Sequence, residues 1–137
     1  MTAPGYVLDA SVVIKMVVAE PGSDAARRLR GLRLAAPDLI WAECANILWK
    51  AVRRGILEAP QAELACATLL RLPFEVVPSA GLLPAALQRA VTLDHPACDC
   101  LYLELAATLG LPLVTADRRL RLLASPEVQV IGLDDLA

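Results

Sequence analysis

The chain has 137 residues, a formal net charge of −2 and 57% hydrophobic residues, a size that suits one domain over residues 1–137 with a real core. The negative charge argues against a protein that coats nucleic acid through a large positive field. Charged residues interrupt every apolar stretch before the roughly 18–20 residues of a membrane span, so we expect no membrane association.

The first half of the chain predicts one strand, over residues 6–9, followed by helices. Apolar residues recur in these helices at helical spacing, and turn or capping residues separate them. The helices are expected over residues 12–18, from about 24 to 34, 39–53 and 60–72. The second of them is arginine-rich, and Asp38 is placed to cap the third.

The second half of the chain alternates strands with helices. Strands are expected over residues 74–77, 111–116 and 128–131, helices over 82–93, 97–109 and directly after Asp117, and a tail over 133–137. Short apolar strands separated by helices are typical of a mainly parallel sheet with helices on both faces. The sequence therefore predicts an α/β fold, arranged as a three-layer α/β/α sandwich.

The segment before the first strand and the cysteines bear on the compartment. No basic, apolar leader precedes the first strand, so we expect a cytoplasmic protein. The four cysteines lack the paired CxxC spacing of zinc sites, and we interpret them as small buried apolar residues. A zinc site of His95, Cys98 and Cys100 is the weaker alternative, because no second cysteine pair completes it.

Acidic residues are expected to meet at one edge of the sheet. Asp9 ends the first strand and Asp117 follows the strand over 111–116, and ligand crevices of open α/β sheets lie outside the carboxyl ends of strands. Asp99 lies in the first turn of the helix that leads into that strand, so antiparallel packing returns it to the same edge. Glu43 is harder to place, since two helices separate it from the next strand, but it lies on an apolar helical stripe.

The chemistry of these acids follows from their surroundings. A carboxylate on an apolar stripe is unfavourable unless it is paired, hydrogen-bonded or bound to metal. No Lys or Arg lies three or four residues from Glu43 or Asp99, the distance of helical neighbours, although an ion pair from elsewhere in the chain is an alternative. Carboxylate oxygens suit Mg²⁺ or Mn²⁺, and such ions promote phosphoryl transfer. The acids therefore indicate a metal-dependent site that acts on phosphates.

Two hydroxyl residues and two arginines lie near these acids in the sequence. Ser11 and Thr115 are each two residues from an acid, where their hydroxyls are placed to hold a carboxylate or a metal-bound water. A role as turn or cap residues is the alternative. Arg118 and Arg119 follow Asp117 immediately and are our candidates for phosphate contacts, with a solvated helix face as the alternative.

Four segments resemble the motifs of PIN domains, notably of bacterial VapC-type toxins. They are residues 7–15 (VLDASVVIK), 38–46 (DLIWAECAN), 95–107 (HPACDCLYLELAA) and 113–120 (LVTADRRL). Each segment carries one of the four acids, in the family's order and spacing, and together they span nearly the whole chain. Cys98 stands where the family commonly has an aromatic residue and Met16 where it often has tryptophan, but neither is a ligand position.

The resemblance implies a PIN-like fold and a Mg²⁺-dependent endoribonuclease, with Mn²⁺ able to substitute, whose metal is held by Asp9, Glu43, Asp99 and Asp117. It also implies an RNA substrate of the translation machinery, a homodimer, and a cognate antitoxin whose tail occupies the acidic crevice. The chain would then be the toxin of a type II toxin–antitoxin pair. The residues themselves indicate metal-dependent phosphoryl transfer, whereas RNA and the toxin role rest on the resemblance.

Two other functions compete with this interpretation. A non-catalytic PIN-like module that binds RNA or protein has no need of all four acids. A receiver-like phospho-acceptor domain also gathers acids at strand ends, but it needs paired acids at the first strand and a late lysine. Asp9 has no acidic neighbour, and the only lysines, Lys15 and Lys50, lie early in the chain.

Overall fold

A parallel sheet forms the centre of the computed structural model, which describes residues 4–123 and 125–136. Residues 1–3, Ala124 and Ala137, the last residue of the predicted tail, lie outside the described residues. Within them the sheet has five strands, all parallel, in the order β3-β2-β1-β4-β5. The strands are β1 (Gly5–Leu8), β2 (Arg33–Pro37), β3 (Glu75–Val77), β4 (Leu113–Thr115) and β5 (Val130–Gly132).

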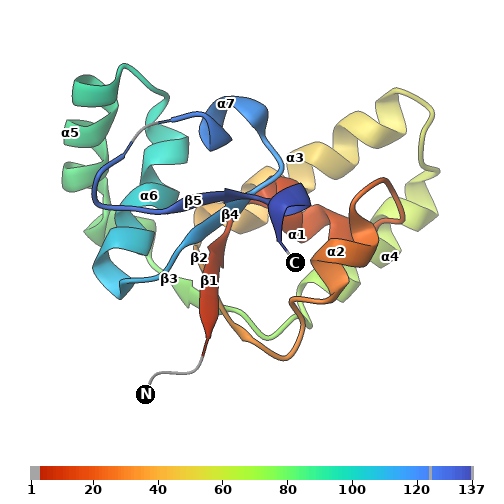
Figure 1. Ribbon diagram of the computed structural model, residues 1–137. Helices are drawn as coiled ribbons and strands as arrows, with labels where there is room; N and C mark the ends of the chain where they lie inside the picture. Colours follow the sequence, from red (N-terminus) through yellow and green to blue (C-terminus); the bar gives the residue numbers. More distant parts are fainter. Residues whose placement is uncertain (1–3, 124, 137) are drawn as a thin grey trace.

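Helices cover both faces of the sheet (Figure 1). One layer contains α1 (Ala10–Val17), α2 (Ser23–Arg27), α3 (Leu39–Arg53) and α4 (Ala59–Leu69). The opposite layer contains α5 (Leu83–Leu93) and α6 (Ala97–Leu109), which pack against each other, and the short α7 (Arg118–Arg121) follows β4. The predicted three-layer α/β/α arrangement is confirmed. Among the described residues, no helix has the length and apolar character to cross a membrane.

Strand β2 is the main departure from the expected elements. The arginine-rich helix was expected to extend to Leu34, but α2 ends at Arg27 and the chain turns at Gly31, whose φ is +88°. Leu-Ala-Ala has little intrinsic preference for a strand, yet β2 is paired on both edges, where small side chains fit beneath helices. Tertiary packing therefore decides the conformation of β2, and α3 begins directly beyond its carboxyl end.

Asp38 does not cap α3 as expected. Its carboxylate instead accepts hydrogen bonds from the backbone N–H of Ser79, at 3.1 Å, and from the Ser79 hydroxyl. These bonds lower the pKa of Asp38. They tie the start of α3 to a 3-10 turn, Ser79–Gly81, that follows β3. α3 nevertheless begins and ends at the predicted residues.

The C-terminal end of the described chain differs from the prediction in two places. Strand β5 begins at Val130 rather than residue 128. The residues after it, expected as a tail, form a second 3-10 turn, Leu133–Asp135, in which Leu133 is buried. This anchoring holds β5 beside β4 and completes the edge of the sheet.

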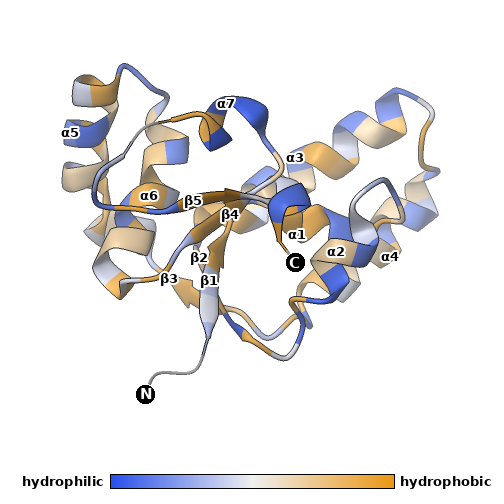
Figure 2. Ribbon diagram, viewed as in Figure 1, coloured by the Kyte–Doolittle hydropathy of each residue, from blue (hydrophilic) through white to orange (hydrophobic). Residues whose placement is uncertain are grey.

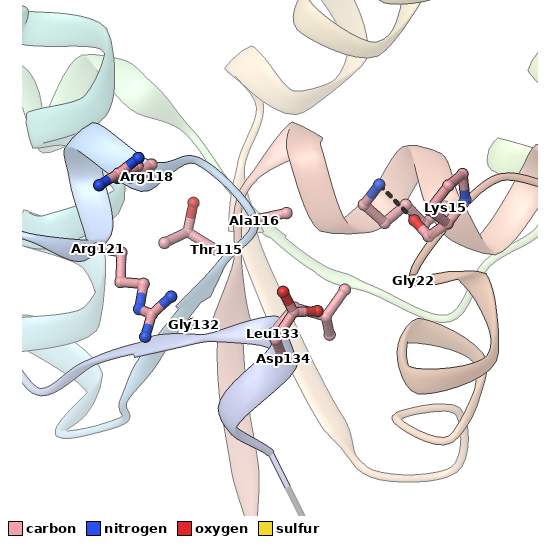
Figure 3. Close-up of a pocket in the computed structure, with 10 residues that line it drawn as sticks. Lys15, Gly22, Thr115, Ala116, Arg118, Arg121, Gly132, Leu133 and Asp134 are labelled. Carbon is pink, nitrogen blue, oxygen red and sulfur yellow. Dashed lines mark hydrogen bonds between the residues drawn. The ribbon is translucent and has the colours of Figure 1, made fainter.

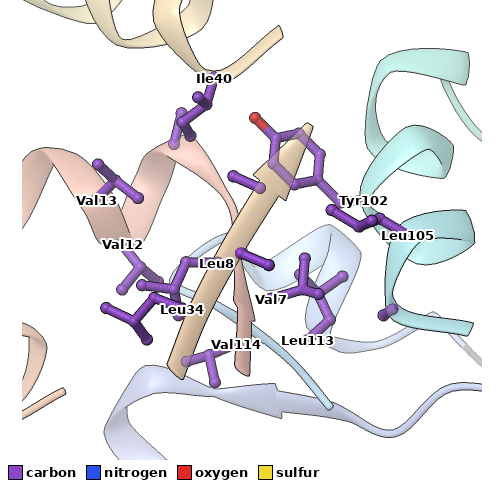
Figure 4. Close-up of a cluster of buried hydrophobic side chains, with 14 of the residues drawn as sticks. Val7, Leu8, Val12, Val13, Leu34, Ile40, Tyr102, Leu105, Leu113 and Val114 are labelled. Atoms are coloured by element: carbon purple, nitrogen blue, oxygen red, sulfur yellow. The ribbon is translucent and has the colours of Figure 1, made fainter. Parts of the chain in front are cut away.

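The hydrophobic core lies on both sides of the central strand β1 and its neighbour β4 (Figures 2 and 4). Val7, Leu8, Leu113 and Val114 have no exposed surface. Tyr102 of α6 is the largest of the fully buried side chains, and its hydroxyl points out of the apolar cluster toward the start of α3 (Figure 4). The rigid core therefore fixes the carboxyl ends of β1 and β4 relative to both helical layers.

Candidate active site

Strands β1 and β4 are neighbours at the point where the strand order of the sheet reverses. The connections from these strands leave toward opposite faces, so a crevice opens outside their carboxyl ends. Asp9 follows β1 directly, and its backbone N–H donates to the carbonyl of Val114 at 3.4 Å. Asp117 lies just beyond β4. The topology therefore brings these two acids to one edge, as the sequence predicted.

A cavity of about 250 Å³ at this edge is lined by all four predicted acids. Asp9 and Asp117 come from the ends of β1 and β4, Glu43 from α3 and Asp99 from the first turn of α6. Strand β2 explains the position of Glu43, because α3 starts at the same edge of the sheet as the other acids. The structure thus brings the four carboxylates together, while their role as metal ligands stays a prediction.

Asp9 is the most buried of the four acids, with 6% of its surface exposed. Its carboxylate accepts hydrogen bonds from the hydroxyls of Ser11 and Thr115, both at 2.5 Å, and from the backbone N–H of Val12 at 3.3 Å. Burial outweighs these bonds and raises the pKa of Asp9 to about 6. Both predicted supporting hydroxyls therefore contact Asp9 directly.

Thr115 also connects two of the acids. Its hydroxyl oxygen accepts from the backbone N–H of Asp117 at 3.0 Å while the hydroxyl donates to Asp9. The Asp117 carboxylate in turn accepts from the backbone N–H of Arg119 at 2.8 Å, which caps α7. The end of β4 is therefore held in one conformation on the cavity side.

Two contacts that the sequence analysis missed hold the remaining acids. The phenol of Tyr102 donates to Glu43 at 2.5 Å, and the Nε2 atom of His95 lies 2.7 Å from Oδ2 of Asp99. Burial raises the pKa of Glu43 despite the bond from Tyr102. For His95 the available signal was its position four residues before Asp99, whereas no local pattern indicated the Tyr102–Glu43 contact, which joins residues 59 apart.

The alternative zinc site is not formed. The ring of His95 contacts Asp99, Cys98 is exposed and Cys100 is buried. Cys44 is buried as well, and burial raises the pKa of its thiol to about 12, so it is unreactive. The prediction of buried cysteines is therefore wrong for Cys98, which faces solvent from the first turn of α6.

The carboxylates surround the cavity without forming a finished ligand cluster. Across residues 4–123 and 125–136, no three His, Cys, Asp or Glu side chains stand close enough to hold one ion. Each acid is bound by its own donors, and like charges in one cavity repel one another. A set made only of carboxylate and hydroxyl oxygens fits a hard divalent cation such as Mg²⁺ or Mn²⁺, which would offset that repulsion.

Helix α3 contributes two further residues to the wall of this cavity, Asn46 and Lys50. They follow Glu43 by three and seven residues and so lie on the same face of the helix. Neither residue was assigned a role from the sequence, because helical spacing from Glu43 was the one available signal and it indicates a site only once the cavity is known.

The predicted phosphate-binding arginines lie outside the acid cavity. Arg118 and Arg119 are both exposed, and neither lines it. Arg118 instead lines a neighbouring cavity of about 390 Å³, together with Thr115 and Ala116 at the end of β4. Figure 3 shows Arg118 and Arg121 on one side of that cavity and Lys15 on the other.

The cations of this neighbouring cavity are partly neutralised. Lys15 pairs with Glu20 at 3.1 Å, and Arg121 pairs with Asp135 at 2.9 Å. Such exposed or half-exposed pairs contribute little to stability but reduce the local positive potential. Arg118 has no ion-pair partner among the described residues.

Comparison with known proteins agrees with this geometry. The family model described as PIN domain matches residues 6–126. The chain is 34% identical over 115 residues to Ribonuclease VapC12 of Mycobacterium tuberculosis, over 83% of this chain and 88% of that protein. The structure of PAE2754 from Pyrobaculum aerophilum matches with a TM-score of 0.73 and 26% identity, over 97% of this chain and 92% of that one.

A chain of a toxin-antitoxin complex from Klebsiella pneumoniae has the same fold, with a TM-score of 0.62 at 13% identity, over 93% of this chain and 97% of that one. The residues that the family model matches, 6–126, include all four acids. The chain therefore belongs to the PIN domain family.

Proposed function

We propose that this protein is a Mg²⁺-dependent endoribonuclease that hydrolyses RNA phosphodiester bonds, with Mn²⁺ able to substitute. The observation that carries the proposal is the cavity at the β1–β4 edge, which four carboxylates from four separate elements line. The choice of RNA is supported by the name of the relative with 34% identity, a ribonuclease. Together these favour hydrolysis over binding alone.

Asp9, Glu43, Asp99 and Asp117 would hold the metal. When bound, a divalent ion polarises the phosphodiester and lowers the pKa of a water molecule. The chain's own part is orientation: Ser11 and Thr115 fix the two oxygens of Asp9, and Tyr102 fixes Glu43. Carboxylates that are already oriented need little rearrangement during the reaction.

The arginines beside Asp117 belong to the same proposal as RNA contacts. Arg118 and Arg119 are exposed on α7, next to the cavity, where they would bind phosphates on one side of the cut. Such contacts position the RNA and leave the chemistry to the carboxylates. Removing both should raise KM and flatten the salt dependence of binding.

The proposed biological role is that of the toxin in a type II toxin–antitoxin pair, acting on RNA in the cytoplasm. The resemblance to VapC-type toxins and the relative named VapC12 support this role. A cavity lined by four carboxylates would also attract a basic side chain, so an antitoxin tail with such a residue would fit the same place as the metal. Inhibition would then follow from competition at the site.

A homodimer is part of the proposal, with α5 as the contact face. Leu83, Leu87 and Val91 lie four residues apart on α5 and expose 52%, 57% and 76% of their surfaces. An apolar stripe of this kind is typical of a helix that packs on a partner. Light scattering should give twice the chain mass for the wild type and a lower mass for Leu87→Glu.

Incubation with total cellular RNA tests the proposed function. The wild type should produce discrete RNA fragments with Mg²⁺ or Mn²⁺ and none with EDTA, and Asp99→Asn should produce none under any condition. RNA binding without fragments in all conditions would support the non-catalytic module instead. Fragments formed equally well in EDTA would contradict a metal-dependent reaction.

A further inference from the structure

The α3 wall of the acid cavity offers hydrogen-bond donors as well as a carboxylate. Glu43, Asn46 and Lys50 lie within about 60° of one another around the helix axis, from the 3.6-residue turn. Long side chains on a helix lean toward its N-terminus. Lys50 therefore leans back along α3 toward Asn46 and the four acids, and it lines the cavity with them.

The ammonium group of Lys50 is not held by another polar group among the described residues. Within the described residues neither its ammonium nor the amide of Asn46 has a hydrogen-bond or ion-pair partner, and both residues are exposed. Lys15, the other lysine, differs, because it donates to Glu20 at 3.1 Å and to the carbonyl of Pro21 at 2.8 Å. Lys50 is also the one Lys or Arg side chain among the residues that line the acid cavity.

The negative charge of the cavity is the reason why a cation at its rim would favour RNA binding. The four carboxylates outweigh a single divalent ion, so an RNA strand that approaches the loaded site still meets negative charge. A cation at the rim lowers that barrier and binds a phosphate oxygen as a point charge. Asn46, one turn closer to the acids, supplies an amide N–H for the same anion.

We propose that Lys50, assisted by Asn46, binds the phosphodiester group next to the one that is cut, on the α3 side of the cavity. This inference rests on the proposed function and adds a binding subsite to it. Arg118 lies at the β4 side of the acids, so Lys50 and Arg118 flank them. The RNA backbone would cross the carboxylates between these two cations.

Lys50→Gln tests the subsite, with Arg54→Gln as the matched control. Both changes remove one positive charge from the same helix region, but Arg54 follows the last residue of α3 and does not line the acid cavity. Lys50→Arg keeps the charge. Binding of a single-stranded RNA is measured from low to moderate salt in an Asp99→Asn background, which leaves the RNA intact, and KM and kcat are measured with the active enzyme.

The subsite predicts that Lys50→Gln raises KM several-fold with little change in kcat, and lowers the salt slope of RNA binding by about 0.7, the value for one lost phosphate contact on a single strand. Lys50→Arg should restore the slope, and Arg54→Gln should match the wild type. Equal effects of Lys50→Gln and Arg54→Gln would overturn the subsite. A wild type that neither binds nor cuts RNA would instead refute the proposed function.

Discussion

Asp9 and Asp99 line the same cavity but are held in different ways. Asp9 is almost fully buried and is bound by two hydroxyls and a backbone N–H, with no cationic side chain in contact. Asp99 keeps 25% of its side chain exposed and contacts the ring of His95. An acid held only by neutral donors in a buried site is unfavourable when ionised. In the metal-free protein, ionised Asp9 should therefore lower the free energy of unfolding more than ionised Asp99 does.

The largest expected effect does not distinguish the two acids. Asp9→Asn and Asp99→Asn should each lower RNA cleavage by more than about 100-fold, since loss of a ligand exceeds the roughly 10–100-fold loss seen when only a supporting contact is removed. Initial rates at saturating Mg²⁺ measure the effect, with circular dichroism to confirm folding. Wild-type activity in either variant would remove that residue from the site.

Stability without metal should separate the two acids. Raising the pKa of Asp9 from 3.8 to about 6 corresponds to about 3 kcal/mol of lost stability at neutral pH, at 1.36 kcal/mol per unit. Asp9→Asn removes that penalty and should raise the free energy of unfolding in EDTA by an amount up to this size. Asp99→Asn gains nothing comparable, because it loses the contact with His95.

Urea unfolding in EDTA at pH 7 measures both variants. If Asp9 were the partner of a buried cation, its substitution would leave an uncompensated charge and destabilise the protein by roughly 3–5 kcal/mol. A clear loss of stability in Asp9→Asn would therefore contradict the proposed destabilisation by Asp9. Equal gains in the two variants would show that the two acids affect stability alike.

The pH dependence of stability provides a smaller, independent test. Because the pKa of Asp9 is raised on folding, to about 6 from 3.8, its protonation favours the folded state. This contribution is complete below pH ~4 and is lost as pH rises through about 6. The metal-free wild type should therefore gain stability relative to Asp9→Asn as pH is lowered from 7 to 5. Parallel pH profiles would show that Asp9 titrates normally.

The supporting contacts should give the smallest effects. Ser11→Ala removes one hydroxyl from Asp9, and His95→Ala removes the ring beside Asp99. Each should weaken Mn²⁺ binding by about 10–100-fold, as for other residues that orient metal ligands. Cys98→Ala, at an exposed neighbour of Asp99, is the control. If His95→Ala binds Mn²⁺ as tightly as Cys98→Ala does, the ring does not position Asp99.

The sequence predicted those parts of the molecule in which local pattern and tertiary structure agree. Helices α3 and α6 have the predicted boundaries, and Asp9 and Asp117 meet because β1 and β4 are neighbouring parallel strands whose carboxyl ends lie at one edge. Strand β2 was missed because its Leu-Ala-Ala segment becomes a strand only through pairing on both sides. Because β2 was missed, the position of Glu43 at the same edge of the sheet could not be predicted.

The contacts between side chains were less predictable than the acids themselves. Tyr102 and Glu43 lie 59 residues apart in the chain, and only the packing of α6 on the sheet brings them together. Lys50 and Asn46 follow helical spacing from Glu43, but that spacing indicates a site only once the cavity is known. The role of a single hydroxyl or lysine depends on its neighbours in the fold. Four acids in the order typical of the family already indicate a metal-dependent site.

Calorimetric titration of Mn²⁺ tests the central claim, that the four carboxylates act as one metal site, most directly. The wild type should bind Mn²⁺ saturably and release protons on binding near pH 6, because the metal competes with the proton on Asp9. Asp9→Asn should bind Mn²⁺ far more weakly and release fewer protons. Equal affinity and equal proton release in the wild type and in Asp9→Asn would contradict the shared metal site.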